Sequence, residues 1–363
     1  MNSTFSVKMI QILGLLICLT LPSACESEGA ASTNEPVVQW RFAIEETIGS
    51  VQHQYALKFK ELIETRSEGK IEVTIYPYGT LGTSDQITEL VDMEVIQFAM
   101  ASPGHLGKLI PEVQVFLLHF LFSDDDEINN KVLNEDPKLQ ETFDELYARK
   151  DLKLLSIFSE GWQVWTTKKD IQKPDDFQGV KMRVMTTPLL LAAYEAYGAS
   201  PTPLPYSEVY SALQLNMIDG QENPVFAIQE MNFYEVTDWM IFARHAPFIT
   251  TAVTNREFFN SLSPERQKLV LGVVSDLNGY ILDVQKQFNR ERLNLIRKNR
   301  PKLNIVDELT PEARIAFREA SQPVREQFIE MTGEDGRQLL EEIKATIKEY
   351  ERKQTPASST AQD

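Results

Sequence analysis

The chain has 363 residues, of which 42% are hydrophobic and 25% are charged. This balance is typical of globular proteins, and the length suggests about two domains. The formal net charge of −17 argues against nucleic acid and anionic membrane surfaces as partners, because like charges repel. It does not exclude an anionic small molecule, because one arginine can dominate the charge of a pocket.

The N-terminus resembles a bacterial export signal. Lys8 precedes a mostly apolar run at 9–21, which is too short for a comfortable membrane span. The segment LPSAC at 21–25 resembles a lipoprotein signal, although Pro22 stands where a small aliphatic residue is usual. Cleavage before Cys25 would leave one cysteine at the new N-terminus and none in the folded domain. We therefore predict a signal peptide at 1–24, lipidation of Cys25 and a polar tether at 25–37, with plain secretion as the alternative to lipidation.

The first third of the mature chain alternates strands and helices. Apolar periodicity predicts strands at 40–44, 70–76 and 96–101, with a helix that begins after Ser50 and another at 85–92. This order predicts a sheet covered by helices. Glu45 and Glu46 follow the first strand, where they could contact a cationic ligand group or simply be solvated surface acids.

Two polar or aromatic segments follow the next strands. His105 comes after the strand at 96–101, in the turn SPGH, and is either a ligand contact or a turn histidine. A strand at 152–158 leads to Trp162 and Trp165, of which one could offer an aromatic surface to a ligand while the other belongs to the core. Between His105 and this strand, the acidic run at 124–127 lacks the spaced ligands of a cation-binding loop, so we expect it to be the solvated start of a helix.

A buried-looking arginine ends the strand at 180–184. Val180, Met182 and Val184 alternate with polar neighbours, and Arg183 lies near the end, before a helix predicted at 189–197. Side chains at the carboxyl ends of strands in an open α/β sheet face the crevice where ligands bind. There, Arg183 could grip a carboxylate with two parallel hydrogen bonds. A surface arginine paired with a neighbouring acid is the alternative.

The segment after this helix supplies two more candidates. Three prolines stiffen the approach to Tyr206, and a helix is predicted from Ser207 to about residue 218. Asn223 precedes Pro224 and should therefore be extended or in a turn. Its amide can both donate and accept, which suits a ligand carboxylate or amide, although a turn-stabilising asparagine is the alternative.

The C-terminal part is mostly helical. We predict a strand at 248–254, a long helix at 264–300, two or three helices at 311–353 and a disordered polar tail at 354–363. The long helix should pack on its own domains, so we expect a monomer. Nucleotide-binding, GxSxG and HExxH motifs are absent from the sequence, and the histidines lack metal-ligand spacing. We therefore expect neither a metal nor a cofactor, and no enzymatic activity.

Three segments resemble a known family. GKIEVTIYPYGTLG, GVKMRV and PTPLPYSEVYSALQLNMIDGQENP are similar to segments of the DctP-type solute-binding proteins of TRAP transporters, above all the ectoine-binding members. The resemblance runs from about Trp40 to Ile347. It implies an α/β, two-lobed, periplasmic-binding-protein-like fold of type II, with mixed sheets flanked by helices and a ligand cleft between the lobes. The lobes would comprise 38–160 with 249–290, and 161–248 with 291–350.

The resemblance also implies a function and a site. The protein would capture a small organic acid or zwitterion, ectoine-like or otherwise, at the periplasmic or cell-surface side and deliver it to a TRAP permease. Glu46, Arg183 and Asn223 match the ectoine-binding members, and Phe226 matches an aromatic residue of their pocket. His105 and Tyr206 would make the wall more polar. Gln163 stands where many members carry a second arginine, so a second carboxylate clamp is not expected. The open alternatives are a secreted enzyme with Glu46 as base and a ligand-sensing module.

Overall fold

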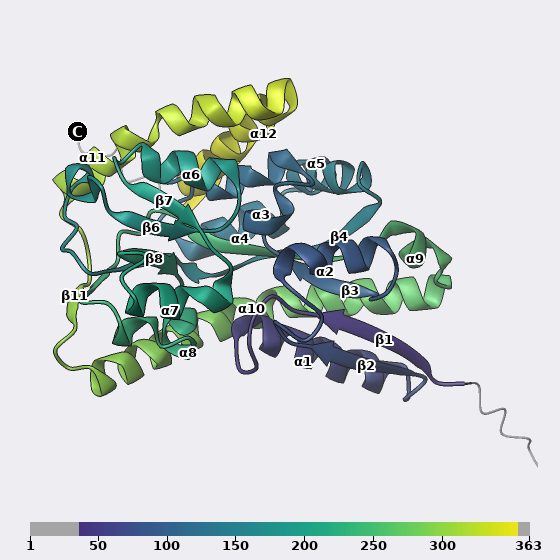
Figure 1. Ribbon diagram of the computed structural model, residues 1–363. Helices are drawn as coiled ribbons and strands as arrows, with labels where there is room; N and C mark the ends of the chain where they lie inside the picture. The colour runs from purple at the N-terminus through teal and green to yellow at the C-terminus, as the bar shows by residue number, and fades with distance from the viewer. Residues whose placement is uncertain (1–35, 355–363) are drawn as a thin grey trace, which may run out of the picture. The chain divides into compact units, whose positions relative to one another are not determined.

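The computed structural model describes residues 36–354. The predicted signal peptide, Cys25, nearly all of the tether and the tail from residue 355 lie outside the described residues. The chain from Val37 onward forms one unit, which contains two mixed β-sheets with helices packed on both (Figure 1). The expected α/β fold with two sheets flanked by helices is therefore confirmed.

The first sheet has five strands in the order β2-β1-β3-β10-β4. Their bounds are β1 (Val38–Ala43), β2 (Ile71–Tyr76), β3 (Phe98–Ala101), β4 (Leu152–Trp162) and β10 (Pro247–Asn255). β1 is parallel to β2 and β3, whereas β10 is antiparallel to β3 and β4. The parallel strands are linked by the helices α1 (Val51–Arg66) and α2 (Ser84–Asp92), as the alternating sequence pattern predicts.

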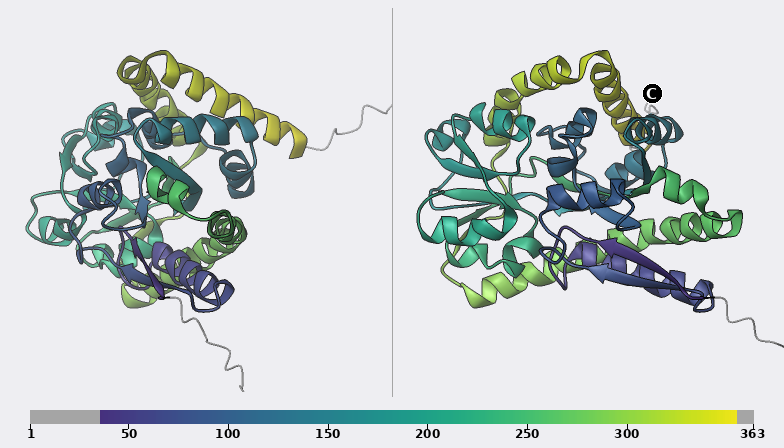
Figure 2. Two further views of the ribbon diagram at one scale, coloured as in Figure 1. Left: turned by 90° about the vertical axis from the view of Figure 1, so that its right-hand side faces the viewer. Right: turned by 45° about the vertical axis from the view of Figure 1, so that its right-hand side comes forward.

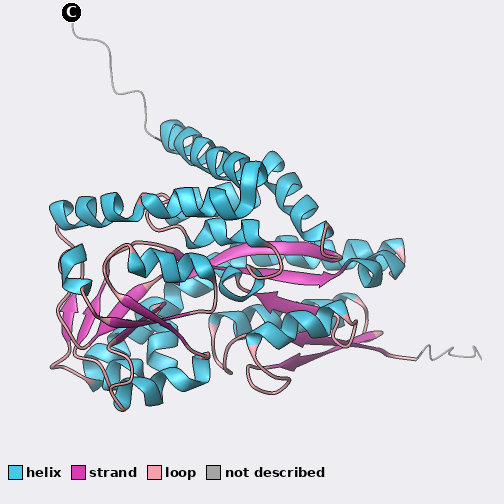
Figure 3. Cartoon of the chain, turned by 45° about the horizontal axis from the view of Figure 1, so that its top comes forward, coloured by secondary structure: helices cyan, strands magenta, loops and turns pink. Residues whose placement is uncertain are grey.

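The second sheet has six strands in the order β11-β9-β5-β8-β6-β7. Their bounds are β5 (Val164–Thr167), β6 (Lys181–Val184), β7 (Ser200–Pro203), β8 (Gly220–Asn223), β9 (Trp239–Ile241) and β11 (Asn304–Val306). β6 is parallel to β7 and β8, and β5 is antiparallel to β8 and β9. The two sets of strands are drawn in magenta in Figure 3.

The remaining elements are helical. The α-helices are α3 (Pro103–Leu106), α4 (Asp126–Asn134), α5 (Pro137–Ala148), α6 (Pro188–Glu195), α7 (Val209–Gln214), α8 (Val225–Glu230), α9 (Arg256–Ser261), α10 (Pro264–Asn299), α11 (Pro311–Ser321) and α12 (Pro323–Gln354). The 3₁₀ segments are η1 (Pro111–Leu117), η2 (Pro174–Phe177), η3 (Tyr206–Glu208) and η4 (Phe233–Glu235). None of the helices within residues 36–354 combines the length and apolar character that a membrane span requires.

Three connections join the two sheets. Gln163 alone separates β4 from β5, and residues 242–246 separate β9 from β10. These two crossings are tied together, because the Gln163 N–H donates to the Ala246 carbonyl oxygen over 2.9 Å. The long helix α10 is the third connection, since it contacts α1 and β4 on one side and α8 on the other (Figure 2).

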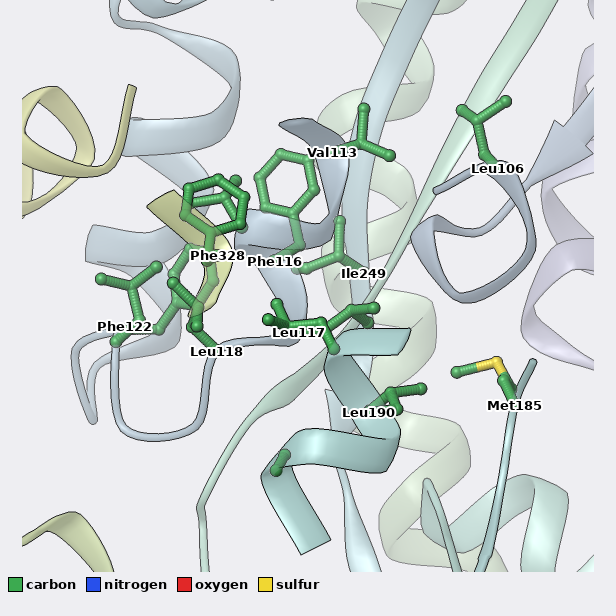
Figure 4. Packing of buried hydrophobic residues seen from close by; sticks show 14 of the residues in the cluster. Leu106, Val113, Phe116, Leu117, Leu118, Phe122, Met185, Leu190, Ile249 and Phe328 are labelled. Atoms are coloured by element: carbon green, nitrogen blue, oxygen red, sulfur yellow. The ribbon is translucent and has the colours of Figure 1, made fainter. Parts of the chain in front are cut away.

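The core is divided among three clusters of buried side chains. One lies between the first sheet, α1 and α10, where Phe42 and Phe59 meet edge to face at 5.2 Å between ring centroids. The largest gathers η1, α4, α5, α6 and α12, and it also takes in Met185 and Ile249 (Figure 4). The third packs α7 and α8 on the second sheet. Ser50 begins α1 as predicted, because its Oγ accepts from the His53 N–H at 3.0 Å.

Several sequence predictions of local structure can be compared directly. The helix predicted at 264–300 is α10, and Asp125 caps α4 within the acidic run, as expected of a helix start. The helix predicted from Ser207 is shorter than expected. It begins as η3, continues as α7 and ends at Gln214, because Asn216 adopts a left-handed conformation with φ of 58°. The lobe boundaries proposed from the resemblance stay a prediction.

Candidate functional site

A small cavity lies where strands of both sheets end. Glu45 and Glu46 follow β1, Ser102 follows the parallel strand β3, and Arg183 lies on β6 beside β8, which ends at Asn223. The carboxyl ends of neighbouring parallel strands meet at one edge of a sheet, which brings these side chains together. The space inside it is about 30 Å³, which holds at most a few water molecules. It is lined by Glu45, Glu46, Gln52, Ser84, Ser102, His105, Arg183, Met185, Tyr206, Asn223 and Phe248.

Arg183 is the buried cation of this cavity. Its side chain breaks the simple alternation of β6, since Lys181 is exposed whereas Arg183 is only 3% exposed. Its Nε and Nη2 donate to the Leu204 carbonyl oxygen over 3.0 and 2.8 Å, and its Nη1 has no acceptor within residues 36–354. Burial lowers the pKa of Arg183 to about 10, so it stays charged at neutral pH.

Asn223 and Tyr206 border the same cavity. The Asn223 Nδ2 donates to the Gln221 Oε1 at 2.5 Å, which fixes the side-chain amide at the end of β8. The Tyr206 ring meets Tyr78 and Phe233 edge to face, each at 5.8 Å between centroids. Burial raises the pKa of Tyr206 well above its usual value, so its hydroxyl stays protonated and can donate a hydrogen bond.

His105 reaches the cavity from α3 and is held by an acid. Its Nδ1 lies 2.9 Å from Asp85 Oδ1, and Lys108 contacts the other oxygen of that carboxylate, also at 2.9 Å. The hydrogen bond from His105 is the main cause that lowers the pKa of Asp85 to about 2. His105 also borders a second, wider hollow at the surface, lined by side chains of both charges from α2 to the turn at 149–151. That hollow does not contain Arg183 or Glu46.

Buried carboxyl groups border the same cavity from the end of β1. Glu46 is 7% exposed and Glu45 is 6% exposed. Glu45 Oε2 accepts from the Ser102 N–H at 2.8 Å, and Glu46 Oε2 accepts from the Gln52 N–H at 3.3 Å. Burial raises the pKa of both carboxyl groups, and the neighbouring Glu160 raises that of Glu46 further. The cavity is thus bordered by both acids and a guanidinium, an arrangement that suits a ligand with both a carboxylate and a positive or proton-donating group.

Comparisons with known proteins show the family that the chain resembles. Residues 42–331 match the family model described as bacterial extracellular solute-binding protein, family 7 (DctP). The ectoine/5-hydroxyectoine-binding periplasmic protein UehA of Ruegeria pomeroyi is 41% identical over 88% of this chain and 93% of its own. These two matches, to the family model and to a relative over most of both chains, show the family of this protein.

The chain belongs to the DctP family. The solved structure of the ectoine-binding protein TeaA of Halomonas elongata superimposes on this chain with a TM-score of 0.83 at 39% identity. The superposition covers 86% of this chain and 99% of that one. A TRAP solute-binding protein of Marinobacter aquaeolei in an open, ligand-free form gives a TM-score of 0.80 at 42% identity, covering 85% and 100% of the two chains. The expected family is confirmed.

Two of the residues predicted for this DctP-family pocket lie elsewhere. Phe226, on α8, is fully buried in the core cluster with α1 and α10 and does not line the cavity. Trp162 also lies outside it, because its Nε1 donates to Asp126 Oδ1 at 2.8 Å and the Arg244 guanidinium covers its ring at 4.9 Å. The structure therefore brings together five of the seven predicted residues: Glu46, His105, Arg183, Tyr206 and Asn223.

Several cavity residues were not singled out from the sequence. Gln52 lies inside α1, Met185 follows β6 and Phe248 lies on β10, and none belongs to a recognisable motif. Ser102 and Met185 had an available signal, because each directly follows a predicted strand as Glu45 does. The others reach the cavity only through tertiary packing, which one sequence does not reveal.

A second small cavity adjoins the first and contains Gln163. The space inside it is only about 10 Å³, and it shares Ser102, Met185 and Phe248 with the first. Gln163 is 4% exposed, and its Oε1 has no hydrogen-bond donor within the described part of the chain. This oxygen is an acceptor, so the cavity lacks the cationic clamp that an arginine would supply at this position.

A buried network borders this second cavity. Glu222 Oε2 accepts from the Tyr194 hydroxyl at 2.5 Å and lies 2.7 Å from His245 Nε2, while His119 Nδ1 lies 2.8 Å from the Tyr197 hydroxyl. Although burial raises the pKa of Glu222, His245 and its other partners hold it below the usual value, and burial lowers the pKa of His119 to about 3. The ligating atoms of His119, Glu222 and His245 lie within 4.8 Å of one another, a spacing that could hold a metal ion. Their present hydrogen bonds give them a structural role behind the cavity.

Proposed function

We propose that this protein captures a small organic acid or zwitterion outside the cytoplasm and delivers it to the membrane subunits of a TRAP permease. One observation carries the proposal. A buried guanidinium, Arg183, and a buried carboxyl group, Glu46, border the same small cavity from different sheets. A zwitterion offers each of them a partner, and burial makes such charge-assisted hydrogen bonds strong.

Among zwitterions, we favour ectoine or a related compound. Two relatives of about 40% identity carry ectoine in their names. Ectoine joins a carboxylate to a delocalised cation on one small ring, which suits a cavity bordered by both a guanidinium and buried carboxyl groups. The hydroxyl of Tyr206 and the imidazole of His105 make this cavity polar enough for a hydroxylated ligand as well.

The test is a thermal-shift screen followed by calorimetric titration. Ectoine, 5-hydroxyectoine, succinate and a sugar acid would be offered separately to the purified mature protein. A ligand at 100 times its dissociation constant should add about 2.7 kcal/mol to the free energy of unfolding. A stabilising effect of succinate without any effect of ectoine would contradict the zwitterion assignment, and no effect of any small acid would contradict the function.

Binding should occur without turnover. We infer this from the lack of a recognised catalytic motif and from the solute-binding relatives, which supply the expectation of capture and release. Mass spectrometry of the ligand after prolonged incubation with the protein tests it, because any product that forms in proportion to protein and time would indicate an enzyme.

We also propose that the mature protein is a monomer held at the extracytoplasmic side of a membrane by a lipid on Cys25. The support is the sequence at 21–25 and the names of the relatives, which are periplasmic proteins.

A further inference from the structure

A second carboxyl group, Glu160, lies behind Glu46 and does not line the cavity. Both are tied to one residue on α1. The Gln52 Nε2 donates to Glu160 Oε1 at 3.0 Å, and the Gln52 N–H donates to Glu46 Oε2 at 3.3 Å. The Gln52 Oε1 in turn accepts from the Glu45 N–H at 2.8 Å. Gln52 therefore fixes the two carboxyl groups beside each other, one toward the ligand and one toward the core.

The pair has no cation of its own. Glu160 is fully buried, and its Oε2 has no hydrogen-bond donor among the described residues. Neither has Oε1 of Glu45, which is 6% exposed and borders the cavity. These two acceptors are buried polar atoms without partners, which are rare in folded proteins unless a proton, a water or a ligand meets them.

The surrounding acids offer the pair no positive charge. Glu230 on α8 faces Glu46 and accepts from the Thr47 hydroxyl, and burial together with Glu46 raises the pKa of Glu230 to about 8. The Tyr206 hydroxyl on η3 is protonated. Neither of these acids carries a positive charge, so neither can stabilise the negative charge of an ionised carboxylate in the pair.

The basic groups nearby form no ion pair with Glu46 or Glu160. Arg183 donates to the Leu204 carbonyl oxygen, and Arg292 lies 3.7 Å from Glu230. On α1, the His53 Nδ1 accepts from the Gly49 N–H, which requires that nitrogen to be unprotonated, and His105 is bound to Asp85. Two buried carboxylates without a paired cation would cost several kcal/mol, so one of them must keep a proton.

We propose that Glu46 and Glu160 share one proton in the ligand-free protein, and that a ligand cation binding beside Glu46 displaces this proton into the solvent. The O–H bond of the pair breaks, the proton passes to water or buffer, and the released negative charge is balanced by the cation of the ligand. This inference rests on the proposed capture of a zwitterion. It makes Glu160 a positioning residue, which acts on the ligand only through Glu46.

The direction of the pH dependence follows from this exchange. Burial raises the pKa of Glu160 to about 7, and that of Glu46 is raised as well, so the shared proton is present below neutral pH. Below the pKa of the pair, binding releases one proton, and the affinity should rise about tenfold for each pH unit. Above that pKa the proton has already left, and the affinity should no longer depend on pH.

The ligand-free protein provides the first test. Infrared spectroscopy at about pH 6, where ordinary carboxyl groups are ionised, should show the carbonyl stretch of a protonated carboxyl group in the wild type. Glu160→Gln keeps the shape and the acceptor for Gln52 but removes the like charge, so this band should weaken or vanish. Glu230→Gln is the matched control, because it removes the band of a nearby protonated acid outside the pair and should leave the band of the pair itself. A wild type without the band, or a band lost only in Glu230→Gln, would overturn the proposal.

Calorimetry with ectoine provides the second test. Titrations at about pH 6 would be made in phosphate and in imidazole, which differ in ionisation enthalpy. For the wild type and Glu230→Gln, the difference between the two apparent binding enthalpies should correspond to the release of about one proton per ligand bound. The difference should be largely lost in Glu160→Gln, although that variant still binds ectoine. Binding of ectoine by the wild type with equal enthalpy in both buffers would overturn the proposal. Absence of binding heat in every buffer, with the infrared band still present, would instead contradict the ligand class and the ligand-linked half of the inference.

Discussion

Arg183 donates twice to the carbonyl oxygen of Leu204, from Nε at 3.0 Å and from Nη2 at 2.8 Å. This contact holds the plane of the guanidinium between β6 and the loop before η3. It leaves Nη1 without an acceptor among the described residues, beside the cavity. A carboxylate that enters the cavity would therefore meet a cation whose orientation is already set, which reduces the entropy lost on binding.

Replacing Arg183 should abolish high-affinity binding. Removing one partner of a buried charge pair costs about 2–5 kcal/mol, or roughly thirty-fold to several-thousand-fold in affinity. Arg183→Lys should also bind poorly, because an ammonium group cannot reproduce the planar donor pair that anchors to Leu204. Calorimetric titration with ectoine checks this, and melting curves serve as the control for folding. Binding by Arg183→Ala within about three-fold of the wild type would show that Arg183 has only a structural role.

Replacing Glu46 should separate two ligand types. Glu46→Gln keeps the hydrogen-bonding shape but cannot carry a charge, so it should weaken ectoine strongly and a plain carboxylate such as succinate only slightly. The measurement is a pair of titrations of the same variant with both compounds. Equal losses for both would mean that Glu46 does not contact the cationic part of the ligand.

The buried acids should make the ligand-free protein less stable as the pH rises. The pKa of Glu160 is about 7 in the folded chain and lies near 4.3 when unfolded, so the folded state binds the extra proton between these values. The contribution to stability is therefore complete below about pH 4.3 and is lost as the pH rises through about 7, at roughly 1.4 kcal/mol for each pKa unit of difference.

Glu160→Gln should flatten this part of the stability curve. Its melting temperature, measured across the same pH range, should exceed that of the wild type on the alkaline side, where the wild type must bury a charge. The surface variant Glu89→Gln serves as the control, since Glu89 is exposed on α2 and should follow the wild type. Parallel curves for wild type and Glu160→Gln would argue that Glu160 is ionised in the folded protein at all pH values tested.

Phe226 should matter for stability more than for binding. It is fully buried among α1, α10 and the first sheet, and it does not border the cavity. Phe226→Ala should lower the free energy of unfolding by about 3–5 kcal/mol, the usual cost of a large cavity in a core. Urea unfolding and ectoine titration of the same variant distinguish the two roles. A loss of affinity without a loss of stability would restore Phe226 to the binding site.

Cys25 should carry a lipid at the N-terminus of the mature protein. The apolar run at 9–21 and the small residues before Cys25 predict cleavage at this point. Mass spectrometry of the protein purified from its native membrane would detect the lipidated peptide. A mature form that is soluble and begins at another residue would contradict this prediction.

The sequence by itself determined the alternating strands and helices, the family and the residues that follow strands. Apolar patterns place β1, β3, β6 and α10 within a few residues of their observed bounds. α10 buries one stripe of side chains, whereas β3 is a short run that is buried at every position. Arg183 could be singled out by its place near the end of a strand, with a surface ion pair as the alternative, whereas Glu46 stood out from solvated surface acids only through its match to the ectoine-binding members.

Only the tertiary structure decided which side chains meet. Gln52 and Glu160 are separated by 108 residues, and nothing in the local pattern of α1 or β4 indicates that their side chains form a hydrogen bond. The same applies to Phe226 and Trp162, whose aromatic rings suit a ligand pocket as well as a core. Packing of α8 against α10 turns Phe226 inward, and Asp126 with Arg244 holds Trp162 away from the cavity. Such contacts depend on the relative positions of whole elements, which a pattern of neighbouring residues does not encode.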